Sequence, residues 1–138
     1  MNCLKQLTVV TILGAMSCIG LPAQSIEMRA KIPFDFQVGN RILPAGEYDV
    51  RNESDWIILK RSDGSGVSTA VMTNAALSPV ADRGARLQFH RYGDAYFLAQ
   101  VWRAYDHAGR DVVPSDLEKR LAKLSAPAKP VVVAARSR

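Results

Sequence analysis

The sequence predicts an all-β fold: a small antiparallel β-sandwich or β-barrel with one short C-terminal helix. Three observations predict it. Apolar and polar residues alternate with a period of two from Ile26 to Val38, as in a strand with one buried face. Short apolar runs separated by turn residues then continue to about residue 113, which predicts about seven to nine strands. The only good helical pattern lies at 115–124.

A secretory signal peptide is predicted at residues 1–25. Lys5 precedes an apolar run from Leu7 to Leu21, and Ala23-Gln24-Ser25 provides a small-x-small cleavage site. The run is shorter than the roughly 20 apolar residues of a membrane span. We therefore expect cleavage before Ile26, a periplasmic or extracellular location, and no transmembrane span in the mature chain. An uncleaved anchor and a lipoprotein attached through Cys18 remain alternatives.

Cysteine content and charge restrict the chemistry of the mature chain. Cys3 and Cys18 both lie in the predicted signal peptide, so a disulfide, a thiol nucleophile and a zinc–thiolate site are not expected. The formal net charge of +5 is unevenly distributed, because residues 26–118 hold 11 basic and 13 acidic residues. From Lys119 onward there are six basic residues and no acidic ones. A near-neutral body exported from the cell does not predict nucleic-acid binding.

The β domain is predicted at 26–114. Pro33 cannot donate to a strand ladder, so the first alternating segment is one bent strand or two strands joined at the proline. Gly39-Asn40 is typical of a tight hairpin turn, and residues 43–46 (LPAG) fit a type I turn. Further strands are expected at 47–51, 56–59, 67–73, 85–92, 95–102 and 111–113, with a loop at 74–84.

Residues 89–102 (FHRYGDAYFLAQVW) predict a hairpin with a type II′ turn at Gly93-Asp94. This turn places Arg91 opposite Tyr96, where cation and ring can stack, and His90 opposite Phe97. His90 is therefore interpreted as a structural residue. The second strand is apolar on both faces, which predicts that both faces are covered.

The C-terminal region divides into a helix at 115–124 and a tail at 125–138. Ser115 and Glu118 match a capping box, and Leu117, Leu121 and Leu124 share one helical face. We expect this helix to dock on the sheet or to plug one barrel end. Pro127 and Pro130 favour a flexible basic tail, which could contact anionic surfaces; an edge strand at 131–133 is the less favoured alternative.

Three motifs together resemble a family of small, exported, uncharacterised bacterial proteins. They are residues 32–50 (IPFDFQVGNRILPAGEYDV), the hairpin at 89–102, and residues 113–123 (VPSDLEKRLAK). The resemblance covers nearly the whole mature chain. It implies export and a common fold, and it implies no activity, cofactor or catalytic residue.

The sequence predicts no catalytic or metal-binding site. The segment YDHAGRD offers Asp106, His107 and Asp111 as oxygen and nitrogen ligands, but this set is incomplete for a metal, and a turn explains it better. Nucleotide-binding and nucleophile-elbow motifs are absent from the sequence. We therefore assign no catalytic residue, metal or cofactor. A ligand or partner surface is suggested by the residues Trp56, Tyr92, Tyr105 and His107.

The resulting hypothesis is an exported, non-enzymatic binding or interaction module of the bacterial cell envelope. Its partner would be a protein, a polysaccharide or an apolar small molecule. A small β-barrel carrier of an apolar ligand is the alternative, and a small hydrolase without a recognisable motif is third. A carrier needs an apolar interior void, an interaction module has a filled core, and an enzyme gathers ionisable groups in a cleft.

Overall fold

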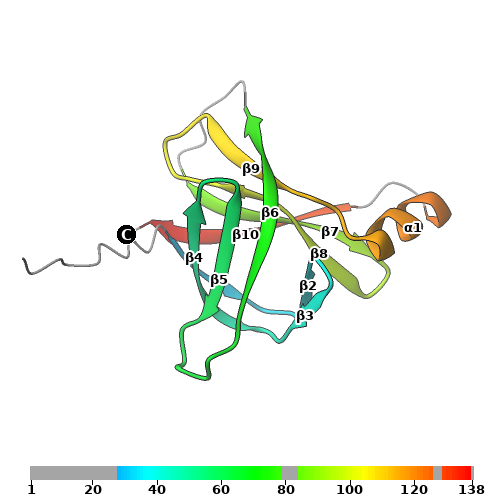
Figure 1. Cartoon of the computed structure of the whole chain (residues 1–138), viewed down its shortest axis with the longest axis horizontal. Coiled ribbons are helices and arrows are strands. Elements are labelled where there is room, and N and C mark those ends of the chain that lie inside the picture. The colour runs from blue at the N-terminus through cyan, green and yellow to red at the C-terminus, as the bar shows by residue number, and fades with distance from the viewer. Residues whose placement is uncertain (1–27, 79–83, 126–128, 138) are drawn as a thin grey trace, which may run out of the picture.

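The computed structural model describes residues 28–78, 84–125 and 129–137. The predicted signal peptide at 1–25, its cleavage site and Cys18 lie outside these ranges. Figure 1 shows ten strands and one helix in the described part of the chain. The elements are β1 (Met28–Ile32), β2 (Phe36–Val38), β3 (Arg41–Leu43), β4 (Gly46–Glu53), β5 (Trp56–Arg61), β6 (Ser68–Leu77), β7 (Ala85–Tyr92), β8 (Ala95–Trp102), β9 (Ala108–Val112), α1 (Asp116–Leu124) and β10 (Lys129–Ser137).

Eight of these strands form a closed antiparallel barrel. The ring runs β1, β4, β5, β6, β9, β8, β7 and β10, and the pairing of β10 with β1 closes it. The expected all-β fold with one C-terminal helix is confirmed, and of the two architectures the barrel is the one formed. The described strands exceed the expected seven to nine because the Pro33 region divides into two and because β3 and β10 were not among the expected strands.

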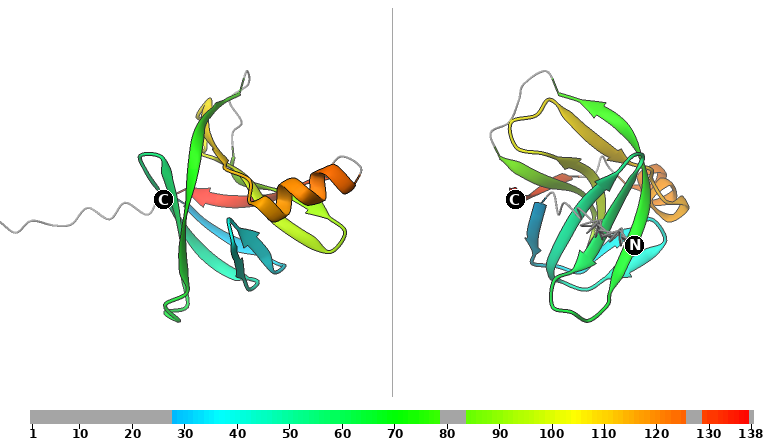
Figure 2. Two further views of the ribbon diagram at one scale, coloured as in Figure 1. Left: turned by 45° about the vertical axis from the view of Figure 1, so that its right-hand side comes forward. Right: turned by 60° about the vertical axis from the view of Figure 1, so that its left-hand side comes forward.

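The predicted flexible tail is wrong for residues 129–137, which form β10. This strand lies between β7 and β1, with Val133 opposite Leu87 and Ala135 opposite Ala30. Figures 1 and 2 show β10, in red, as one strand of the barrel wall. Val131, Val133 and Ala135 pack against the core, while Val132 faces outward. The alternation was present in the sequence, but only the two unpaired neighbouring edges make the segment a strand.

Pro33 separates β1 from β2, so the two-strand interpretation of the first segment is correct. The residues between them turn the chain toward β8, where Gln37 pairs with Phe97 in the barrel's one parallel contact among the described strands. Phe34 stacks on Tyr96, with ring centroids 3.9 Å apart, and packs edge-on against Phe89 at 5.1 Å. This aromatic cluster fills one end of the barrel.

The barrel interior is packed in its middle. Tyr48, Leu87 and Phe89 have no exposed surface, and Phe36 packs edge-on against both Tyr48 and Phe89. These rings come from different strands, so the filling of the barrel connects opposite walls. The interior at this level is a core and leaves no channel.

The β7–β8 hairpin has the predicted register. Tyr92 pairs with Ala95, Arg91 with Tyr96, and His90 with Phe97, and Gly93 has the positive φ of +60° that a type II′ turn needs. The Arg91 guanidinium lies 5.3 Å from the Tyr96 ring centroid. Both faces of β8 are buried as expected: Phe97, Leu98, Ala99, Val101 and Trp102 are all buried.

Two strand boundaries differ from the sequence prediction. Residues 74–77, expected as a loop, extend β6, and β9 begins at Ala108 instead of residue 111. The two extensions pair with each other, Leu77 with Ala108 and Ala75 with Arg110. Cross-strand pairing therefore orders a segment whose composition alone favours a loop.

Helix α1 docks on the outer face of the sheet, one of the two expected positions, and does not plug a barrel end; its predicted apolar face is only partly buried. Ser115 caps it as predicted, accepting a hydrogen bond from the Glu118 backbone at 3.2 Å. Leu117 and Leu124 are nevertheless exposed, whereas the Glu118 side chain is buried. Figure 2 shows α1 beside the β7–β8 hairpin, on the outside of the barrel wall. Among the described residues, no helix has the length and hydropathy needed to cross a membrane.

A matched pair of substitutions in β10 tests its place in the wall. We expect Val133→Asp to lower the free energy of unfolding by about 2 kcal/mol, because it turns a charge toward the core. Val132→Asp faces solvent and should change it by less than about 0.5 kcal/mol. Urea unfolding followed by circular dichroism measures both. Equal effects of the two variants would contradict the strand.

Tyr48 makes the stability sensitive to high pH. Burial raises the pKa of the Tyr48 phenol above its ordinary value, although nearby Arg61 partly opposes this. The phenol donates a hydrogen bond to the Pro44 carbonyl at 2.6 Å. Its contribution is full below the unfolded-state pKa of about 10 and is lost as pH rises through the higher folded-state pKa.

We expect Tyr48→Phe to be less stable than wild type near neutral pH by about 1 kcal/mol, with a smaller further loss in alkali. Thermal melts at a series of alkaline pH values check this, with Tyr105→Phe as the control at an exposed ring. If Tyr48→Phe loses stability at high pH as the wild type does, Tyr48 is not the cause of that loss.

Candidate functional site

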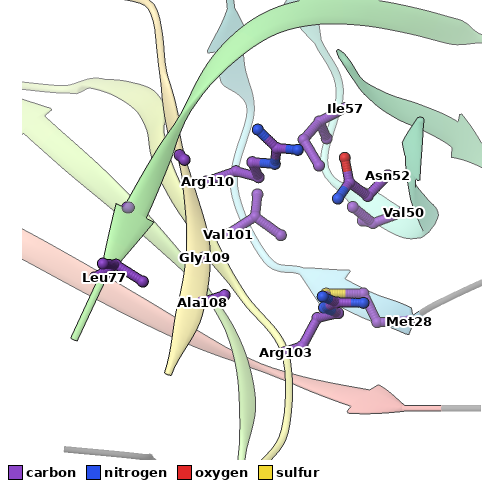
Figure 3. Close-up of a pocket in the computed structure, with 12 residues that line it drawn as sticks. Met28, Val50, Asn52, Ile57, Leu77, Val101, Arg103, Ala108, Gly109 and Arg110 are labelled. Atoms are coloured by element: carbon purple, nitrogen blue, oxygen red, sulfur yellow. The ribbon is translucent and has the colours of Figure 1, made fainter. Parts of the chain in front are cut away.

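A cavity of about 160 Å³ opens at the barrel end opposite the aromatic cluster. At this end β1, β5, β7 and β9 begin, and β4, β6, β8 and β10 finish. Figure 3 shows the cavity from its open side. We call it the end cavity. Its lining residues are Met28, Val50, Asn52, Ile57, Ala75, Ala76, Leu77, Val101, Arg103, Ala108, Gly109 and Arg110.

The floor of the end cavity is the core itself. Met28, Val50 and Ile57 line it, and each is only 1% exposed. These side chains point inward because they occupy the alternating inner positions of β1, β4 and β5. The cavity remains open above them because β6 and β9 contribute small residues, such as Ala76 and Ala108. An apolar ligand group would displace water from an apolar surface here.

Arg110 crosses the mouth of the end cavity. It starts on β9 and reaches the β4–β5 turn, where its guanidinium donates to the Ser54 carbonyl and lies 3.4 Å from the Asp55 carboxylate. Figure 3 shows this guanidinium toward Ile57 and Asn52, and that of Arg103 toward Met28. Arg103 also pairs with Asp106 at 3.1 Å. Two cations therefore line the mouth.

Asn52 adds a buried acceptor to the wall. Its side-chain oxygen is buried, and it has no hydrogen-bond partner within the described part of the chain. Leaving such a group without a partner costs about 1–3 kcal/mol, so a ligand or water that donates a hydrogen bond here would be favoured. Asn52 lies near the end of β4, opposite Ile57 in the pairing of β4 with β5.

The described residues that line the end cavity include no acid–base group. Its lining contains two arginines and one amide, and it contains no carboxylate, histidine or cysteine. Arginine stays protonated at all ordinary pH values, so the lining offers no group that transfers a proton near neutrality. The arrangement can bind a molecule and orient it.

The four residues proposed from sequence do not form one surface. Trp56 starts β5, and Tyr105 and His107 lie in the β8–β9 turn, all toward the cavity end, whereas Tyr92 ends β7 at the opposite end. None of the four lines the end cavity. His107 has a structural role, since its ring nitrogen Nδ1 lies 3.1 Å from the Ser78 carbonyl and its own carbonyl accepts from the Ser78 backbone.

The turn expected at 106–111 is only partly correct, because Asp106 and His107 lie in the β8–β9 turn whereas Asp111 lies on β9. Asp106 accepts a hydrogen bond from the Ala108 backbone at 2.9 Å, and Asp111 accepts one from Gln100 at 2.7 Å. Across the ranges that the structure covers, no group of three or more His, Cys, Asp or Glu side chains could hold a metal ion.

Trp102 packs on the outer wall and does not line the end cavity. Its ring lies 5.2 Å from the Arg86 guanidinium, and its Nε1 donates to Gln100 at 3.0 Å. A Cβ at Gly109 would lie 2.4 Å from the Trp102 ring, so glycine alone allows β9 to approach β8 this closely. The ring thus sets the position of β9 and, with it, of the mouth.

His90 and Glu118 form a contact that the sequence did not predict. His90 Nδ1 lies 2.9 Å from Glu118 Oε1, on the outer face of β7, and the carboxylate is 6% exposed. Tyr92 lies close by, with its ring 6.5 Å from His90. Burial, and secondarily the Glu118 charge, raise the pKa of the Tyr92 phenol. This cluster ties α1 to the barrel, and it supports the structural interpretation of His90.

The sequence carries little signal for the residues that do line the end cavity. From the sequence, Asn52 is expected in a turn, and Arg103 and Arg110 are expected to be solvated charges beside strands. They converge only because β4, β8 and β9 reach the same end of a closed ring. No protein-family model, no curated protein and no solved structure matches the chain.

The His90–Glu118 contact leads to a prediction about α1. A nine-residue helix is marginal by itself. We expect Glu118→Ala to speed amide hydrogen exchange in residues 119–124 by at least about tenfold, without changing exchange in β7. Asp116→Ala removes an exposed first-turn carboxylate and is the control. Equal exchange rates in both variants would show that another contact holds the helix.

Proposed function

We propose that the protein is an exported, non-enzymatic binding module of the bacterial cell envelope that takes a small ligand in the end cavity. The observation that carries this proposal is the form of the barrel: a filled middle, with one end open above an apolar floor. Export is supported by the signal-peptide pattern at 1–25.

A carrier with an apolar ligand inside the barrel is the second candidate. The apolar floor favours it, since Met28, Val50 and Ile57 would contact such a ligand. The size of the cavity limits it, because ordinary small-molecule pockets have about 300–1,000 Å³. A long lipid chain would have to displace Tyr48, Leu87 or Phe89 from the core. A hydrolase is the least supported, because the cavity lining holds no proton-transfer group.

A protein or polysaccharide partner would bind elsewhere on the barrel. The outward charges of β10, Lys129 and Arg136, keep contact with an anionic surface among the proposals. Arg136 lies directly opposite Arg29, but Asp49 pairs with Arg29 at 2.6 Å, so the local positive charge is partly neutralised. The end cavity is therefore the better-supported site.

Native mass spectrometry tests the proposal on protein purified gently from its own cell envelope. We expect an added small mass that denaturation releases, on a chain that begins at Ile26. Ala75→Phe should lose the added mass because this position lines the cavity opposite Arg110 and its ring would fill the space, whereas Ala70→Phe, at an exposed position of the same strand, should keep it.

Each other outcome has a defined meaning. A bare chain in every preparation contradicts the small-ligand proposal. An added mass that persists in Ala75→Phe places the ligand outside the end cavity. A retained N-terminus contradicts signal cleavage.

A further inference from the structure

The lining of the end cavity has a charge pattern that selects among ligands. The guanidinium groups of Arg103 and Arg110 belong to the lining, whereas their partners Asp106 and Asp55 do not. Asp55 is exposed, so water screens its charge. Among the described lining residues, a bound molecule therefore meets two cations and no anion, and an anionic group is favoured.

Arg110 has hydrogen-bonding capacity left for a ligand. A guanidinium has five N–H donors. Within the described residues, Arg110 uses one on the Ser54 carbonyl and one on the Asp55 carboxylate. The side chain is already extended across the mouth by these contacts, so it is positioned before a ligand arrives, and less entropy is lost on binding.

The buried oxygen of Asn52 requires a different group. It accepts no hydrogen bond from the described chain, so the complementary ligand group is a donor such as a hydroxyl. Figure 3 shows Asn52 and Arg110 at the same side of the cavity, above the apolar floor. A ligand that satisfies both needs polar groups on a compact apolar body.

The volume sets the size of that body. A dry protein cavity of comparable size is known to hold a benzene ring. The end cavity, at about 160 Å³, accepts a single ring, with polar substituents reaching the open mouth.

We propose that the end cavity binds a compact hydroxylated organic acid: one ring or an equally short branched chain, with one carboxylate toward Arg110 and Arg103 and one hydroxyl toward Asn52. This inference rests on the proposed function and specifies the ligand class of the same site. The apolar body would lie on Met28, Val50 and Ile57.

Three probes separate the contributions: para-hydroxybenzoate, benzoate, which lacks the hydroxyl, and para-cresol, which lacks the carboxylate. Titration is followed in methyl NMR spectra of the mature chain. Methyl groups of Met28, Val50 and Ile57 report on the cavity, and those of Val38 and Leu43, outside its lining, are internal controls. We expect para-hydroxybenzoate to bind about tenfold more tightly than para-cresol. It should bind at least about threefold more tightly than benzoate.

Variants assign the two interactions. Arg110→Gln should weaken para-hydroxybenzoate about tenfold and leave para-cresol unchanged. Asn52→Leu should remove the advantage of para-hydroxybenzoate over benzoate. Arg136→Gln removes an equal charge from the outer wall and is the matched control. Arg110 also holds the β4–β5 turn, so Arg103→Gln is the second variant if Arg110→Gln alters the mouth.

The outcomes distinguish this inference from the proposed function. Equal binding of para-cresol and the acids, unaffected by either arginine variant, overturns the acid class while the cavity remains a binding site. No shift of the cavity methyl groups with any probe also overturns the inference. The native mass spectrum then decides the proposed function separately, since a mass lost in Ala75→Phe would identify a different ligand class.

Discussion

The structure depends on the backbone hydrogen bonds that β10 makes on both of its sides. Without β10, β1 and β7 would each present an open edge, and the remaining strands would form an open curved sheet. Open edges invite pairing with other chains, and an open sheet cannot enclose a core. Closure allows the rings of Tyr48 and Phe89, from opposite walls, to share one interior. A C-terminal segment that the sequence predicted as a tail is thus essential to the core.

The two ends of the barrel differ in the side chains that fill them. At one end Pro33 ends β1, and the following residues carry Phe34 against Tyr96 and Phe89. At the other end, small residues on β6 and β9 leave volume unfilled. An asymmetric barrel of this kind has one place where a small molecule can reach the core without unfolding it. That asymmetry is what makes a binding function plausible on physical grounds.

Since no protein-family model, curated protein or solved structure matches the chain, the proposed function rests on the chemistry of the site. The end cavity combines an apolar floor with cations and one unsatisfied acceptor, which suits binding and orientation. The His90–Glu118 pair resembles acid–base machinery, yet it lies on the outer wall and joins α1 to β7. The buried Glu118 carboxylate attaches a helix of which Leu117 and Leu124 stay exposed.

The sequence by itself determined the local features: the β class, the break at Pro33, the register of the 89–102 hairpin and the Ser115 cap. Each depends on neighbours within a few residues, through side-chain period, turn conformation or capping. Only the tertiary structure decided the closure by β10, the burial of Glu118 and the meeting of Asn52 with Arg110. These depend on strand order around a ring, which brings together residues distant in sequence. The same alternation and charge pattern can occur in a flexible tail and in a strand of the barrel wall.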